Sequence, residues 1–189
     1  MICAFFYPFP LSAQAAAPSG DAPAGASGTD AEAPPPGPPG SFREFGLGMD
    51  LGALKSALEK DHLFNFRGDR DVSFLPNRDQ SLIETTGFSF IRRAFFQLRD
   101  GKLFIMAFNL DTGLVDHYSV YTSFVKKYGE PAALSPREAV WESDAVRVAI
   151  ERPLTVKYID KRVFNEIVSE SETAESAELL RRQEFLDDF

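Results

Sequence analysis

Between residues 41 and 169 the spacing of apolar side chains alternates between the period of a helix and the period of a strand. Leu51, Leu54 and Leu58 recur at helical spacing, and Asp50 before them is a residue type that caps helices well. This spacing predicts a helix that ends near Asp61. Short strand-like runs follow at 72–75 and 81–86.

The strongest strand signal is a hairpin centred on Asp100-Gly101. Residues 91–98 and 103–110 are rich in Phe, Ile and Leu, and Asp-Gly is typical of a type I′ turn between two strands. Both faces of the second strand are apolar. We therefore expect a central strand with one face under helices and the other face partly covered.

The succession of a helix and then strands occurs a second time. Tyr121, Phe124 and Tyr128 belong to an apolar stripe that predicts a helix from Asp116, and Gly129 ends it. The remaining elements are three strands, at 139–142, 145–151 and 154–159, and a third helix after Asp160. Tight turns join antiparallel strands, so the predicted fold is α+β: an antiparallel β-meander with helices packed on one face, built as two loosely similar helix-plus-meander halves.

The two ends of the chain differ in composition from this middle part. Residues 1–15 are uncharged and largely apolar and end in Ala13-Gln14-Ala15, the small residues that a signal peptidase accepts, although no basic residue precedes Arg43. Residues 16–40 hold seven Pro, five Gly and seven Ala and predict a disordered linker. The expected organisation is a signal peptide at 1–15, a linker at 16–40, one domain at 41–169 and an acidic C-terminal helix at 170–189.

Charge and cysteine content exclude several functions. The net charge of −8 comes from the linker and the tail, because residues 41–169 contain 18 basic and 18 acidic side chains. A neutral domain offers no basic face for nucleic acid. The single cysteine, Cys3, lies in the predicted signal peptide, so the exported chain would have no thiol chemistry. No apolar run approaches the roughly twenty residues of a membrane-spanning helix.

The segments SFVKKYGEPAAL and AVWESDAVRVAIERPLTVKYID form a helix ending in Lys-Tyr-Gly-x-Pro and a hairpin that carries Trp141. This pattern resembles the SmpA/BamE-like domains of envelope-assembly lipoproteins and the tandem-repeat fold of β-lactamase inhibitor proteins. It covers residues 118–160 well and 48–110 loosely. The resemblance implies a fold and not an activity, and this chain has no lipoprotein cysteine motif.

No residue cluster identifies a reaction. The two histidines, His62 and His117, lie at helix ends, and nothing in their spacing brings them together. Asp69, Asp71 and Asp79 lack the alternation and the closing Glu of a calcium loop, so we interpret them as a solvated loop balanced by nearby arginines. The chain has no nucleophile elbow and no phosphate loop. We predict no catalytic residue, metal or cofactor, and no enzymatic activity.

The candidate partner-binding residues are apolar side chains in the tail, together with one tryptophan. Trp141 is a hot-spot residue type, but a lone Trp on a hairpin strand is more often part of the core. The tail follows helical spacing and either folds back on its own domain or docks in a partner's groove. Its predicted anchors are Leu179, Phe185, Leu186 and Phe189.

These observations favour a non-enzymatic exported domain of the cell envelope that acts through contact with another envelope protein, as an adaptor or in an assembly or inhibitor role. The many phenylalanines support an alternative, a periplasmic carrier with a Phe-lined cavity between sheet and helices for a small apolar ligand or lipid. A hydrolase of envelope polymers is a third possibility, supported only by the predicted location.

Overall fold

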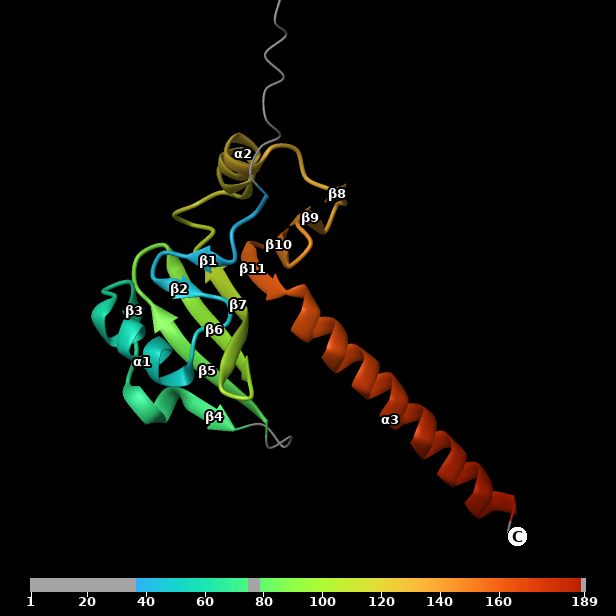
Figure 1. Ribbon diagram of the computed structural model, residues 1–189. Helices are drawn as coiled ribbons and strands as arrows, with labels where there is room; N and C mark the ends of the chain where they lie inside the picture. Colours follow the sequence, from blue (N-terminus) through green and yellow to red (C-terminus); the bar gives the residue numbers. More distant parts are fainter. Residues whose placement is uncertain (1–36, 75–78, 188–189) are drawn as a thin grey trace, which may run out of the picture. The chain divides into compact units, whose positions relative to one another are not determined.

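The computed structural model describes residues 37–74 and 79–187 (Figure 1). The predicted signal peptide and residues 16–36 of the predicted linker lie outside the described residues. Within the described part the chain is α+β, as predicted, with antiparallel pairing throughout its larger sheet. No helix in that part is both long enough and apolar enough to cross a membrane.

The first half of the sheet follows a short ribbon and a helix. The ribbon pairs β1 (Ser41–Phe42) with β2 (Phe45–Gly46), and α1 (Leu51–Lys60) follows it. The strands are then β3 (Phe64–Asn65), β4 (Val72–Phe74), β5 (Gln80–Gly87), β6 (Ile91–Arg99) and β7 (Lys102–Leu110), with a 3₁₀ turn at Gly68–Asp71 between β3 and β4. The predicted hairpin is confirmed. Asp100 and Gly101 have φ angles of 50° and 72°, as a type I′ turn requires.

The second half repeats this arrangement of a helix and then strands. Helix α2 (His117–Tyr128) precedes β8 (Ala133–Leu134), β9 (Glu138–Glu142), β10 (Val146–Glu151) and β11 (Thr155–Asp160). The helix begins after Asp116, as the sequence predicts, and the Asp116 carboxylate caps α2 by accepting a hydrogen bond from the backbone N–H of Ser119 at 2.9 Å.

The two halves join at the centre of the sheet, whose strand order is β3-β5-β6-β7-β11-β10-β9-β8, with β4 beside β5. The last strand of each half, β7 and β11, pair in antiparallel register, with Val156 opposite Phe108 and Tyr158 opposite Met106. One continuous sheet therefore carries both halves.

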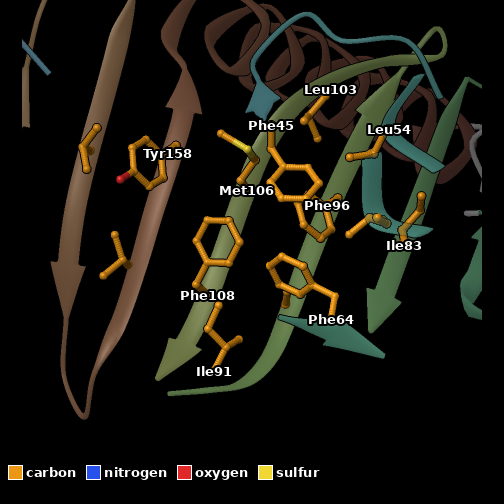
Figure 2. Packing of buried hydrophobic residues seen from close by; sticks show 14 of the residues in the cluster. Phe45, Leu54, Phe64, Ile83, Ile91, Phe96, Leu103, Met106, Phe108 and Tyr158 are labelled. Atoms are coloured by element: carbon orange, nitrogen blue, oxygen red, sulfur yellow. The ribbon is translucent and has the colours of Figure 1, made fainter. Parts of the chain in front are cut away.

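One face of this sheet forms the core. Phe96, Met106 and Phe108 lie on it with Tyr158, and Leu54 of α1 belongs to the same cluster (Figure 2). The rings of Phe96 and Phe108 meet edge to face with their centroids 5.8 Å apart. Helix α2 covers the same face of the sheet with half-buried side chains only, since none of its residues is fully buried.

The C-terminal part differs from its predicted form. A third helix near 160–167 and a separate acidic helix from 170 were expected, but α3 (Lys161–Asp187) is one helix of 27 residues. The physical reason is that residues 161–187 contain neither Gly nor Pro to interrupt it.

Candidate functional site

Helix α3 is attached to the body of the domain at its N-terminal end. The Asp160 carboxylate accepts hydrogen bonds from the backbone N–H groups of Arg162 and Val163 at 3.0 and 3.2 Å. One turn after Ile167, Glu170 forms a 2.6 Å ion pair with Arg99 at the end of β6. The hydrogen bond to Glu170 raises the pKa of Arg99. Helix α3 is therefore connected to the sheet through Glu170, in its third turn.

Beyond Glu170 every helix side chain whose exposure is described is exposed to solvent. This distal half is acidic, with Glu or Asp at six positions of 170–187 and Arg at two. Near its end lie four large apolar side chains, which we call the terminal cluster. They are Leu179, Leu180, Phe185 and Leu186, and they are 53–66% exposed.

Three of the five predicted partner-binding residues, Leu179, Phe185 and Leu186, thus lie together on α3. Phe189 lies outside the described residues. Leu180 was not among the predicted anchors, although its place beside Leu179 could have indicated it. The alternative in which the tail folds back on its own domain does not describe this structure, because the distal half of α3 stays exposed.

Trp141 is apart from this cluster and lies in the core at 2% exposure. Its indole Nε1 donates a 2.9 Å hydrogen bond to the carbonyl of Gly129, and its ring lies 5.3 Å from that of Phe124. Trp141 of β9 therefore connects this strand with α2 through a hydrogen bond and a ring contact. This is the core role that the sequence favoured for it, and it leaves almost no surface for a partner.

The aspartates that the sequence offered as possible metal ligands form ion pairs and hydrogen bonds within the domain. The Asp71 carboxylate is buried rather than solvated, and it accepts hydrogen bonds from the backbone N–H and the guanidinium of Arg67. Asp69 forms an ion pair with Lys55 at 2.7 Å, which lowers the pKa of Asp69. Across residues 37–74 and 79–187, no three His, Cys, Asp or Glu side chains gather as metal ligands would.

The two histidines line different hollows of the surface. His62 lies beside α1, whereas His117 helps to line a pocket of about 480 Å³ with Tyr118, Glu138 and Arg152. The imidazole Nε2 of His117 is buried and has no hydrogen-bond partner within the described part of the chain. Burial, and then the charge of Arg152, lower the pKa of His117.

A third hollow lies between α2 and the core face of the sheet. It has a volume of about 220 Å³. Its lining comes from β1, β6, β7, β11 and α2 and from the segments next to β3 and β6, and it includes four phenylalanines: Phe42, Phe90, Phe108 and Phe124. The sequence suggested a Phe-lined cavity in this position but did not identify which side chains line it.

Comparison with known proteins identifies a family. The model of the TP0088 domain family matches residues 40–170, which include the whole sheet and the first part of α3. No curated protein and no solved structure matches the chain. The likeness to SmpA/BamE-like domains and to β-lactamase inhibitor proteins therefore stays a resemblance of sequence pattern.

Proposed function

The chain belongs to the TP0088 domain family, and we propose that it is a non-enzymatic adaptor of the cell envelope that binds another protein through the terminal cluster of α3. The observation that carries this proposal is the exposure of Leu179, Leu180 and Leu186, at 58%, 66% and 53%, in the part of α3 that follows the ion pair of Glu170 with Arg99. Neighbouring exposed apolar side chains of this kind mark interaction sites on soluble proteins.

The chemistry of the helix specifies the partner's surface. Leu179 and Leu186 are seven residues apart and share one face of α3. The surrounding helix is acidic. The complementary surface is an apolar groove with Lys or Arg along its rim, in which charge sets the association rate and the leucines supply the affinity. The envelope location rests on the apolar N-terminal pattern at 1–15.

Photo-crosslinking in the cell of origin tests the proposal. A photoreactive amino acid replaces Leu180 in one variant and Ala174, an exposed residue on the opposite face of the same helix, in another. We expect one discrete crosslinked protein from position 180 and much less from position 174.

Binding by the purified partner then tests the residues. The variant with Leu179→Ala, Leu180→Ala and Leu186→Ala should raise the Kd at least about ten-fold, as expected for hot-spot side chains. Binding should also weaken as salt is added. The control variant carries Leu114→Ala and Leu134→Ala, two leucines of similar exposure elsewhere on the domain, and should bind normally.

Two results would overturn the adaptor proposal. One is equal binding by the triple variant and its control. The other is a crosslinked product that consists of two copies of this chain, which would make α3 an element of self-association.

A further inference from the structure

The cavity between α2 and the sheet has an almost wholly apolar lining. The walls are formed by Phe42, Phe108 and Val156 on the sheet side and by Val120 and Phe124 of α2, and Phe90, half exposed, lies at its margin. Phe42 packs on Phe108 with a centroid distance of 4.5 Å.

This lining suits an apolar occupant better than water. A buried water makes two to four hydrogen bonds, and among the lining side chains only Tyr158 carries a polar group. The volume of about 220 Å³ exceeds the roughly 150 Å³ of a dry apolar cavity that accepts benzene. A ring with a short side chain therefore fits it.

Tyr158 adds a specific polar requirement. The residue is 4% exposed, and its hydroxyl is the polar group among the side chains that line the cavity. A tyrosine hydroxyl at such a site normally finds a hydrogen-bond partner. Burial, and then the nearby Tyr128, raise the pKa of Tyr158 far above neutrality, so that its hydroxyl stays protonated and able to donate.

We propose that this cavity is a binding site for a small, neutral, largely apolar molecule with one hydrogen-bond acceptor, whose ring or alkyl part lies among the phenylalanines and whose acceptor receives the hydroxyl proton of Tyr158. The site lies on the sheet and α2, away from the terminal cluster of α3, so it is independent of the adaptor role.

Two probes of nearly equal size test the site on the full chain. Acetophenone and ethylbenzene differ at one carbon, which carries a carbonyl oxygen in the first and two hydrogens in the second. Titration followed by NMR should give saturable shifts at residues that line the cavity with both probes. If the shifts do not saturate with either probe up to its solubility limit, the proposal is overturned.

Substitutions separate the two parts of the site. Val120→Phe fills the cavity and should raise the Kd of both probes at least ten-fold. Val168→Phe, the same change on α3, should leave both Kd values unchanged. Tyr158→Phe should raise the Kd of acetophenone about two- to ten-fold, which corresponds to the loss of one hydrogen bond. The Kd of ethylbenzene should change less than two-fold.

Equal binding by Val120→Phe and Val168→Phe would exclude the cavity as the site. If Tyr158→Phe lowers the affinity for both probes equally, the hydrogen bond from the hydroxyl is excluded. If Val120→Phe does not fold, magnetisation transfer between the ethylbenzene ring and the methyl groups of Val120 and Val156 in the unsubstituted chain decides the question, and its absence overturns the proposal.

Discussion

Gly87 ends β5 where the chain turns back towards β6. A Cβ atom at this position would clash with the carbonyl oxygen of Ile91, which is a backbone atom and cannot rotate away. Gly52 is the opposite case, because it lies in α1 and a Cβ there meets no atom within 4 Å.

Gly87→Ala should therefore lower the free energy of unfolding by about 1–3 kcal/mol, the usual cost of an overpacked site. Gly52→Ala should raise it by about 0.5–1 kcal/mol, because alanine loses less entropy in a helix. Urea denaturation of both variants measures the difference. Equal effects of the two changes would mean that the close approach to Ile91 is relieved without cost.

His117 provides a second prediction, on pH. Its pKa is lowered by burial and by Arg152, while Asp116 acts in the opposite direction. The unfolded chain then binds a proton more readily than the folded chain. Stability should fall as the pH drops below the ordinary histidine value of about 6.5 towards the lower folded pKa.

In an NMR titration, Arg152→Gln should raise the pKa of His117 towards 6.5, whereas Arg162→Gln on α3 should not change it. A His117 pKa at or above 6.5 in the unsubstituted chain would contradict the prediction. The residue types alone could not reveal this shift, because it depends on which charges from other segments surround the ring.

At the scale of elements, the distal half of α3 should contribute nothing to the stability of the domain. Its described side chains are exposed, and it follows the ion pair between Glu170 and Arg99 of the sheet. Ala174→Pro interrupts a helix at its interior. We expect it to reduce the helical signal in far-UV circular dichroism and to shift the melting of the domain, followed by Trp141 fluorescence, by less than about 2 °C.

Ala174→Ser is the matched control and should keep both the helical signal and the melting temperature. A fall of many degrees in Ala174→Pro would show that the distal half of α3 packs on the domain in solution, which is the alternative that the sequence left open. The change in Tm thus distinguishes a distal half of α3 that packs on the domain from one that stays exposed to solvent.

At the scale of the whole molecule, the two halves should unfold together, because β7 and β11 join them in one sheet. Phe96 lies in the first half at 0% exposure and contacts the rings of Phe45, Phe64 and Phe108. Trp141 reports on the second half. Phe96→Ala should cost about 3–5 kcal/mol and should lower the midpoints of Trp141 fluorescence and far-UV circular dichroism equally.

An unchanged midpoint for Trp141 in Phe96→Ala would indicate that the halves fold independently. The exposed Phe74→Ala serves as the control, since this ring is 78% exposed and its loss should change stability by no more than about 0.5 kcal/mol.

The sequence by itself determined the elements whose causes are local. The turn at Asp100-Gly101 and the helix between Asp116 and Gly129 follow from residues a few positions apart, and the structure confirms both. The same holds for the α+β class, because tight turns dictate antiparallel neighbours.

Only the tertiary structure decided how distant segments meet. The pairing of β7 with β11, the burial of Trp141 and the lining of the cavity by Phe42, Phe124 and Tyr158 all depend on contacts between residues far apart in the chain. The exposure of the terminal cluster also depends on the tertiary structure. An apolar stripe shows that a helix has a face to bury, whereas the surface available to cover that face depends on the arrangement of the whole chain.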